Sequence, residues 1–412
     1  MAYPDKVTVV KFGPYFSSGS ISFSQLRTNF AERGSGEMKA SDLRRNTDLQ
    51  NDNPIVPDST ENEQISTGSN LSLSQFRNSV KKYFAYQTGT DTNSSFPGEP
   101  GFRMGRLDPN NRGIDWCGNG YSGRDGQNGG TTGNLTKNIQ KTVYITGTCG
   151  SVRSGLPAAQ LSPEVRVYNV RIDVSGSILG YGGLGGYDPR GYPYGNQSGE
   201  NGGIALNLGN IGYKNKVYVQ SSARIYGGGG GGEQGINGGR GVAGTCSRDY
   251  ANQQCGGNAS CNQGGSVIGT YGGNCCESYC VGWPRCKERC SKWLSGVICR
   301  ISQPSTNPIQ GIGGRGGNGQ GYNQSRSSGQ DGSPGGCPTC PSGLSLSGGE
   351  CGTAGGRGGD GGDWGSDGGE TPGQRSRGLA GAAINRDAAL SLDTYRFEGT
   401  NNSDTIRGAI NL

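Results

Sequence analysis

The chain has 412 residues, of which 82 are glycine and 18 are proline, while the set AVILMFWYC supplies only 30 %. A conventional leucine- and valine-rich core along the whole length is therefore excluded. No run of about 18 apolar residues is present, which excludes a transmembrane helix. The first residues, MAYPDKVTVVKFGPYFSS, have neither the basic start nor the long apolar stretch of a secretory signal, and we expect none.

The charged and sulfur-containing residues narrow the function classes. Histidine is absent, which removes the commonest general base and the commonest metal ligand. The net charge of +6 is small and dispersed, so nucleic-acid binding is not indicated. Fourteen cysteines without a signal peptide fit a protein made in the cytosol that works outside it, such as a virion component released by lysis. A lineage with an oxidising cytosol is the alternative explanation.

Residues 1–95 are polar, free of cysteine, and contain a weak repeat. Its copies are ISFSQLR at 21–27, MKASDLR at 38–44 and LSLSQFR at 71–77. Two alternating apolar residues predict a short extended segment, and the serine at the fourth position suits a helix N-cap. The segments LRTNFAER and FRNSVKKYFAY then have apolar residues at helical spacing. We expect three extended-then-helix units that dock on each other or on another surface, against the alternative of well-capped surface helices.

Strand patterns follow a turn-rich stretch. Residues 142–146 and 165–174 show β-type sequence, the latter with a change of phase at Tyr168-Asn169 that predicts a bulge or two strands. Residues 395–397 and 405–410, near the C-terminus, are again predicted to form strands. Val170, Ile172 and Ile178 correspond to Val217, Val219 and Ile225 at a constant offset of 47. Each unit is a strand, a short turn, a second apolar anchor and a glycine tract.

The glycine tracts have period three. The segments 313–319 and 355–363 read Gly-Gly-X without proline, and 227–232 is six glycines. Collagen depends on imino acids, so a collagen-like structure is disfavoured. A bundle of polyglycine II helices is favoured, because bare backbones can approach and exchange hydrogen bonds in place of a side-chain core. Flexible linkers are the alternative.

Disulfides are the favoured state of the cysteines. An all-thiolate zinc site, or a redox pair at the C-x-x-C of residues 337–340, is the alternative. Nine cysteines lie within 246–299, so at least one bridge leaves that segment if all of them pair. The candidates are Cys246, Cys255, Cys261, Cys275, Cys276, Cys280, Cys286, Cys290, Cys299, Cys337, Cys340 and Cys351.

Catalytic chemistry is weakly indicated. A serine–histidine–aspartate set is impossible without histidine. Asp360 and Asp363 could act as a carboxylate pair or as part of a calcium motif, but a solvated surface role is favoured, and we expect no metal and no cofactor. Tyrosines in a Gly/Ser/Asn setting are typical of adaptable binding loops, and rings that cover the edge of the bundle are the alternative. The candidate receptor-binding residues are Tyr181, Tyr187, Tyr192, Tyr194 and Trp364.

These segments together resemble the glycine-rich tail proteins of marine and cyanobacterial bacteriophages. The resemblance rests on ISFSQLRTNF and LSLSQFRNSV, on VRIDVSGSILGYGGLGG and VYVQSSARIYGGGGGG, and on the ending GLAGAAINRD…NNSDTIRGAINL. It implies a polyglycine II sandwich whose loops, such as 187–195 and the cysteine-rich insert, touch the host surface. The insert itself departs from the family pattern.

The resemblance gives the expected organisation and function. Residues 1–95 would attach the protein to other tail proteins, 96–164 would form a linker and the first strands, and 165–412 would be the distal domain with its insert at 246–299. We expect a mostly β and irregular fold, short strands followed by packed tracts, disulfide-stapled, with a small mixed N-terminal region. The expected protein is a non-enzymatic tail fibre or adhesin of the virion, made in the host cytoplasm and part of a multimeric assembly. It would contact a host receptor or glycan, without nucleic acid or membrane insertion. A purely architectural tail or baseplate protein and a surface-polysaccharide depolymerase are the alternatives.

Overall fold

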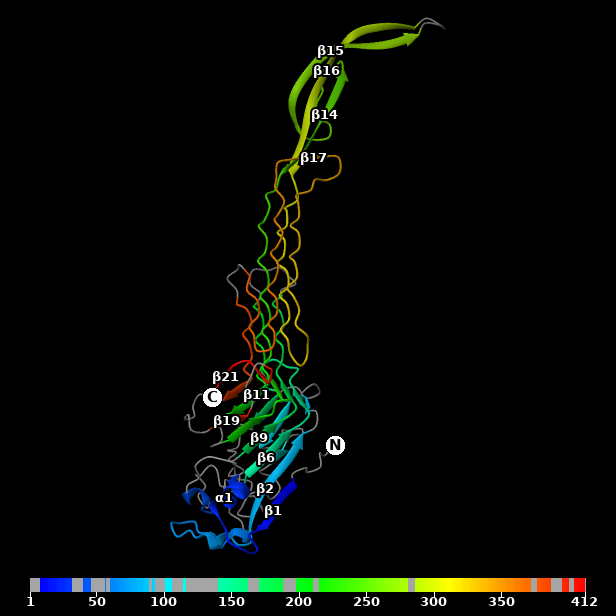
Figure 1. Ribbon diagram of the computed structural model, residues 1–412. Coiled ribbons are helices and arrows are strands. Elements are labelled where there is room, and N and C mark those ends of the chain that lie inside the picture. The colour runs from blue at the N-terminus through cyan, green and yellow to red at the C-terminus, as the bar shows by residue number, and fades with distance from the viewer. Residues whose placement is uncertain are drawn as a thin grey trace. The chain divides into compact units, whose positions relative to one another are not determined.

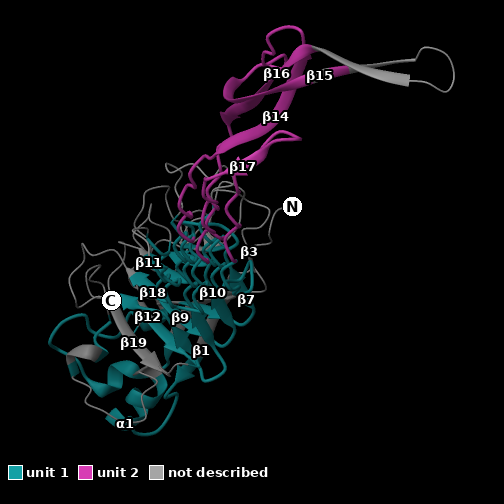
Figure 2. Ribbon diagram, turned by 90° about the horizontal axis from the view of Figure 1, so that it is seen from above, with its two compact units in different colours: residues 1–234, 315–330, 358–412 teal, residues 235–314, 331–357 magenta. Residues whose placement is uncertain are grey.

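The chain forms two compact units in the computed structural model. Unit 1 comprises Met1–Gln234, Arg315–Gln330 and Gly358–Leu412, and unit 2 comprises Gly235–Gly314 and Asp331–Arg357 (Figure 2). The structure describes residues 8–31, 40–45, 56, 60–88, 91–92, 101–105, 114–115, 140–161, 170–187, 198–209, 215–280, 286–371, 376–386, 395–399 and 404–411. Within these residues strands dominate and helices are few and short, as the mostly β fold class predicts.

Unit 1 contains three sheets whose strands are parallel, apart from the antiparallel pair β1 and β2. Figure 1 shows β2, β6 and β9 side by side in the first sheet. In spatial order that sheet consists of β1 (Thr8–Tyr15), β2 (Ser79–Thr88), β6 (Gln140–Ile145), β9 (Val170–Val174), β12 (Asn215–Val219) and β19 (Tyr395–Gly399). The second consists of β20 (Ile406–Arg407), β13 (Arg224–Tyr226), β10 (Ser177–Leu179), β7 (Thr148–Gly150) and β3 (Asp91–Thr92). The third consists of β21 (Ile410–Asn411), β18 (Ile384–Arg386), β11 (Leu206–Gly209), β8 (Ala159–Leu161), β4 (Phe102–Gly105) and β5 (Ile114–Asp115).

Each turn of the chain adds one strand to each sheet, so the strands stack in layers. One layer is β6, β7 and β8, the next is β9, β10 and β11, and the next is β12, β13 and β18. The glycine tracts leave this stack at one place in the repeat, after the second-sheet strand and before the third-sheet strand. Residues 180–205 separate β10 from β11, and residues 227–383 separate β13 from β18.

The core of the stack is made of aliphatic ladders that run across the layers. In the second sheet Cys149, Ile178, Ile225 and Ile406 are consecutive partners, and all four are buried. In the first sheet Val143, Ile172 and Val217 do the same. A conventional apolar core therefore exists in this part of the chain, although the composition excludes one along the whole length. Cys149 lies among the apolar residues of this core.

The sequence offset of 47 between the strand units matches the strand register in the second sheet but not in the first. Ile178 faces Ile225 at this offset in the second sheet. In the first sheet Ile172 faces Val217, an offset of 45, because the turn from β12 to β13 is two residues longer than the turn from β9 to β10. The strand predictions at 142–146, 170–174 and 395–397 are confirmed by β6, β9 and β19, and the one at 405–410 by β20 and β21. Residues 165–169, with the predicted change of phase, lie outside the described residues.

The N-terminal repeat brings its copies together around a second small core. Leu26, Leu43 and Phe76 occupy the same position in the three copies, and all are fully buried in one cluster with Val56 and Ile65. The local helices are α1 (Phe23–Leu26), the π-helix Arg27–Ala31, and the 3-10 helices Ala40–Leu43, Thr60–Asn62 and Leu73–Phe76. The copies therefore dock on each other, which is one of the two outcomes expected for them.

Two details of the repeat prediction are wrong. The N-caps are Ser22 and Ser72, two positions before the predicted serines Ser24 and Ser74, because a glutamine three residues later accepts a hydrogen bond from each cap amide. The Ser22 amide donates to Gln25 Oε1 at 2.8 Å and the Gln25 amide donates to Ser22 Oγ at 3.2 Å. The second error is the helix predicted after Phe76. Asn78 has φ 56°, which ends the helical turn, and β2 follows and pairs with β1 and β6.

Unit 2 contains one antiparallel sheet in its described residues. Its order is β15 (Ser266–Cys280), β16 (Cys286–Pro304), β14 (Thr245–Cys255) and β17 (Ser345–Ser347). The cysteine-rich insert 246–299 thus folds as the three long strands of this sheet. The compact units have other boundaries than the segments predicted from composition, which are 1–95, 96–164 and 165–412. The functional roles of these segments stay a prediction.

Candidate functional site

The glycine tracts of unit 1 exchange backbone hydrogen bonds at every third residue. The amides of Gly180, Gly183 and Gly186 donate to the carbonyls of Tyr226, Gly229 and Gly232, each at 2.9 Å. In the opposite direction, Gly316, Gly319 and Tyr322 donate back to Gly186, Gly183 and Gly180 at 2.8–3.0 Å. Each tract therefore satisfies its main-chain groups on neighbouring tracts and not within itself.

Unit 2 contains the same pattern in its own tracts. Gly235 and Gly238 donate to the carbonyls of Gly314 and Gly311 at 2.8 Å. Gly314 donates in turn to Gly356 at 2.8 Å, and Gly356 donates to Ile236 at 2.8 Å. Three segments of the chain are thereby joined by hydrogen bonds, each segment to the other two.

Space around these glycines admits no side chain. A Cβ added at Gly230, Gly231 or Gly316 would meet the carbonyl oxygen of Gly378, Leu184 or Gly232, respectively, far inside van der Waals contact. In the tract 313–319 the glycines are buried and the third residues, Arg315 and Asn318, are partly exposed. Glycine is required on the inner sides because only a bare backbone fits at this spacing.

Polar side chains at the third position complete the backbone contacts. Asn318 Oδ1 accepts from the Gly185 amide at 3.1 Å, and Asp360 Oδ1 accepts from the Gly329 amide at 2.9 Å. Asp363 Oδ1 accepts from the Trp364 amide at 2.7 Å. The two aspartates considered as a carboxylate pair are thus both engaged with main-chain donors.

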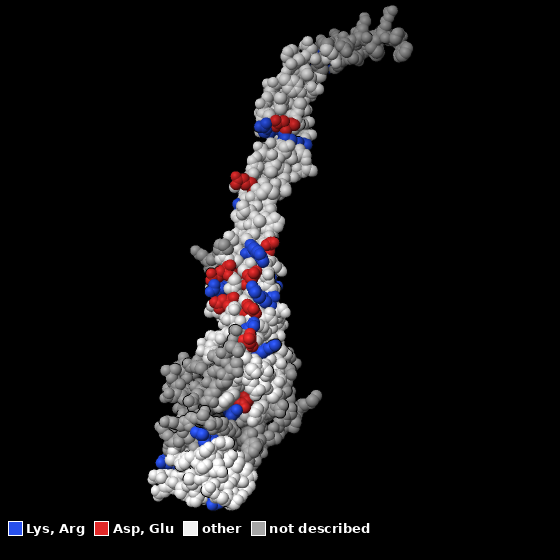
Figure 3. All heavy atoms as spheres, in the orientation of Figure 1, with Lys and Arg blue, Asp and Glu red and all other residues white. Residues whose placement is uncertain are grey.

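Charges of both signs lie over the described tracts of unit 1. Figure 3 shows acidic and basic side chains side by side on the face drawn. Arg377 contacts Glu370 at 2.7 Å and Asp367 at 3.2 Å, all three partly or fully exposed. Exposed ion pairs of this kind contribute little to stability, so we assign the ordering of the tracts to their backbone contacts.

The predicted receptor-binding aromatics have different environments. Tyr181 is 6 % exposed, and its hydroxyl donates to Glu200 Oε2 at 2.9 Å. Burial, followed by the Glu200 carboxylate, raises the pKa of Tyr181 well above its usual value. Tyr187 is 50 % exposed, and the guanidinium carbon of Arg315 lies 5.8 Å from its ring centroid.

Trp364 packs against a ring that the sequence did not single out. Its centroid lies 5.6 Å from that of Tyr226, whose hydroxyl donates to the Asp404 carbonyl at 2.6 Å. The arrangements of Tyr181 and Trp364 agree with the alternative in which rings cover the tracts, whereas Tyr187 is half exposed. Tyr192 and Tyr194 lie outside the described residues. Glu200 and Tyr226 were missed because their hydrogen-bond partners lie 19 and 178 residues away and follow from no local pattern.

Three disulfides are resolved in unit 2, which confirms disulfides for these candidates. They join Cys246 to Cys340, Cys261 to Cys299, and Cys337 to Cys351. Cys255 and Cys276 are also disulfide-bonded. The C-x-x-C cysteines therefore bond to different partners and form neither a redox pair nor half of a zinc site. The remaining candidates, whose side chains lie outside the described set, are Cys275, Cys280, Cys286 and Cys290.

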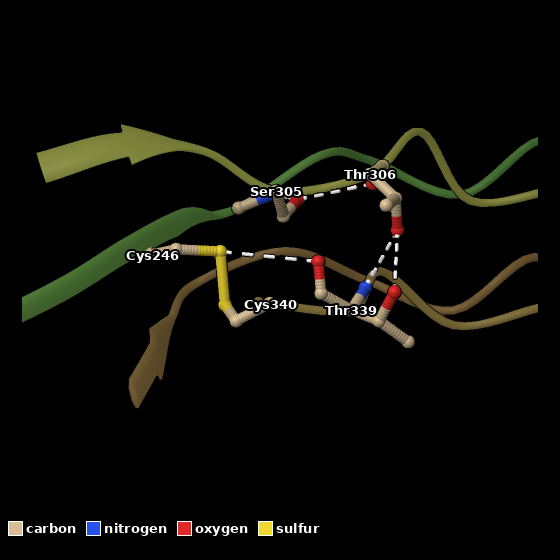
Figure 4. The surroundings of a disulfide bond; sticks show 6 residues. Cys246, Ser305, Thr306, Thr339 and Cys340 are labelled. Atoms are coloured by element: carbon tan, nitrogen blue, oxygen red, sulfur yellow. Dashed lines mark hydrogen bonds between the residues drawn. A yellow bond between two sulfur atoms is a disulfide. The ribbon is translucent and has the colours of Figure 1, made fainter. Parts of the chain in front are cut away.

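The Cys246–Cys340 bond lies where the sheet of unit 2 meets its tracts (Figure 4). The Ser305 amide donates to the Gly244 carbonyl at 2.9 Å, and the Gly244 amide donates to Ser305 Oγ at 2.8 Å. Thr306 and Thr339 are joined in the same reciprocal way, with amide donors at 3.0 and 2.8 Å. One covalent bond and two pairs of hydrogen bonds thus fix the chain at this junction.

Within the described residues, no group of three or more aspartate, glutamate or cysteine side chains could hold a metal ion. Nor does that part of the chain contain a helix with the length and hydrophobicity needed to cross a membrane. No protein-family model, curated protein or solved structure matches the chain.

Proposed function

We propose that the protein is a non-enzymatic structural component of a phage tail, a fibre or adhesin that contacts the host surface. The three-residue ladder of backbone hydrogen bonds between glycine tracts carries this proposal. Such a ladder makes a stiff scaffold from segments that have no side chains to bury, which suits an extracellular appendage. The disulfides of unit 2 support a working environment that is oxidising.

The tracts would form a bundle of polyglycine II helices. Such a helix has three residues per turn and no internal hydrogen bonds. The contacts at 180–186 with 226–232, at intervals of three residues, support this geometry, as do the carbonyl oxygens that a Cβ at Gly230, Gly231 or Gly316 would meet. Ordering glycine costs more backbone entropy than ordering any other residue, so several tracts must pack together to persist.

The N-terminal region would attach the protein to other tail proteins. Its own core of Leu26, Leu43, Val56, Ile65 and Phe76 supports a separately packed module at the start of the chain. Receptor contact would involve Tyr187 and the adjoining loop. Tyr187 supports this role because half of its surface is exposed beside the cationic Arg315.

The buried Tyr181 and the packed Trp364 favour a second candidate, a purely architectural tail protein without receptor contact. Deletion of residues 187–195 separates the two. Host adsorption should fall if the protein is an adhesin and stay unchanged if it is architectural. Electron microscopy of virions labelled with antibody to this chain tests the location in the tail that the two candidates share. Absence of label from the tail would refute both candidates.

A further inference from the structure

The sheet of unit 2 has a long edge strand. β15 spans Ser266–Cys280 and pairs only with β16 among the described residues (Figure 2). A register shift between Val267 and Gly269 is followed by regular pairing over Gly269–Cys275. Alternate amides and carbonyls of this regular stretch point away from β16, as they do at any antiparallel edge. They form a template for another strand.

The regular stretch Gly269–Cys275 of this edge lacks charge and proline, whereas the register shifts of β15 and its Glu277 lie outside that stretch. Charges, proline, short length and β-bulges are the usual protections of a sheet edge. The sequence SVIGTYGGN at 266–274 has no charged residue and no proline. Val267, Ile268 and Tyr271 are 51 %, 46 % and 37 % exposed, so the strand is apolar as well as open.

The other sheet edges among the described residues do carry protection. β1 contains Lys11 and Pro14, and β19 contains Arg396 and Glu398. The remaining edge strands, β3, β5, β17, β20 and β21, have only two or three residues. Among the described edge strands, β15 is therefore the one that is long and has an uncharged stretch available for pairing with another strand.

We propose that β15 pairs with β15 of a second copy of this chain, antiparallel about a two-fold axis near Gly272. In that register Tyr271 of one copy is opposite Gly273 of the other, and Thr270 is opposite Asn274. No like charges meet, because the paired stretch is uncharged. The contact is isologous, since the same residues serve on both sides.

The occupant is a second copy because the edge has nothing with which to select a charged partner. A neutral, self-complementary strand satisfies its own main-chain groups equally well on both sides. Stable protein interfaces bury about 1,200 Å² of accessible surface or more, and one pair of seven-residue strands buries less than that. We therefore expect a weak, concentration-dependent dimer in isolation. This inference is independent of the proposed tail function.

The test is sedimentation velocity of the oxidised full-length chain over a series of concentrations. The mass of the parent protein should rise from that of a monomer toward that of a dimer. Gly273→Lys should raise the dissociation constant at least about tenfold, since it sets like charges close together across the axis. A Cβ at Gly273 meets no atom within 4 Å, so the monomer should fold normally.

Asn258→Lys is the matched control, because it adds the same charge at an exposed position outside the strand and should leave the dimer intact. Thr270→Lys tests the edge independently. The proposal is overturned if the parent remains monomeric at every concentration, or if it forms an assembly other than a dimer. It is also overturned if both edge variants associate as the parent does.

Discussion

Gly316→Ala is the sharpest probe of the tract ladder. The Gly316 amide donates to the Gly186 carbonyl at 3.0 Å, and the next residue, Gly317, accepts from Gly232 at 2.8 Å. An alanine Cβ at position 316 would collide with the Gly232 carbonyl oxygen and lie 2.8 Å from that of Glu233. The colliding atoms belong to backbone, so no side chain can rotate away.

The expected loss follows from three effects. Overpacking a tightly filled site costs about 1–3 kcal/mol. Displacing the tract also weakens two hydrogen bonds, which are worth about 1 kcal/mol each. The lower entropy of the unfolded chain returns about 0.4–1 kcal/mol for a glycine-to-alanine change. The net destabilisation of the tracts is therefore about 2–4 kcal/mol.

Amide hydrogen exchange measured by mass spectrometry reads this loss directly. At about 1.4 kcal/mol per tenfold change, peptides covering 180–186, 227–234 and 315–321 should exchange about 30- to 700-fold faster in the variant. Gly68→Ala is the control, since its Cβ meets only Ser66 Oγ at 3.9 Å. The reasoning is refuted if Gly316→Ala exchanges like this control, or if the parent tracts already exchange as fast as an unfolded chain.

Three further predictions concern other parts of the chain. Leu26→Ala should cost about 2–5 kcal/mol of unfolding free energy in denaturant titrations, whereas Phe23→Ala, half-exposed, should cost less than about 0.5. Non-reducing peptide mapping should recover Cys246 linked to Cys340 and Cys337 linked to Cys351, and a Cys337–Cys340 link would contradict the structure. The pKa of Tyr181 is raised by burial and by Glu200, so its contribution to stability is present below about pH 10 and is lost as the pH rises further. Tyr181→Phe should flatten that alkaline decline in thermal unfolding, and an unchanged pH dependence would count against the assigned environment.

Local pattern was sufficient to place the apolar residues of β9 in the core. Ile172 and Val174 alternate with polar neighbours and lie in the core of β9 as the pattern predicts. The same reasoning failed after Phe76. Val80 and the aromatic residues that follow fit a helical spacing as well as a strand, and pairing with β1 decides between them. Tertiary context therefore overrode a local preference.

The environments of candidate side chains could not be derived from sequence spacing. Tyr181 and Tyr187 share a glycine-rich setting, yet one is buried against Glu200 and the other is exposed. Their exposure depends on which tracts lie alongside, and these tracts are joined by contacts between residues distant in sequence, such as Gly183 with Gly229 and Gly319. Cys340 bonds to Cys246 at a sequence separation of 94 and Cys337 bonds to Cys351 at a separation of 14, and the C-x-x-C spacing alone indicates neither partner.

The place where residues 227–383 depart from the layered strands has a consequence for how such chains diversify. Both ends of this excursion are tied to the same short turn, with Gly227 donating to the Arg407 carbonyl and Ala383 donating to the Ala409 carbonyl. Segments between these ends that do not bond to the tract 180–186 can therefore change in length while the two ends stay fixed. The apolar ladders thus form a fixed core, and the glycine-rich insertion between β13 and β18 is the segment in which length can vary.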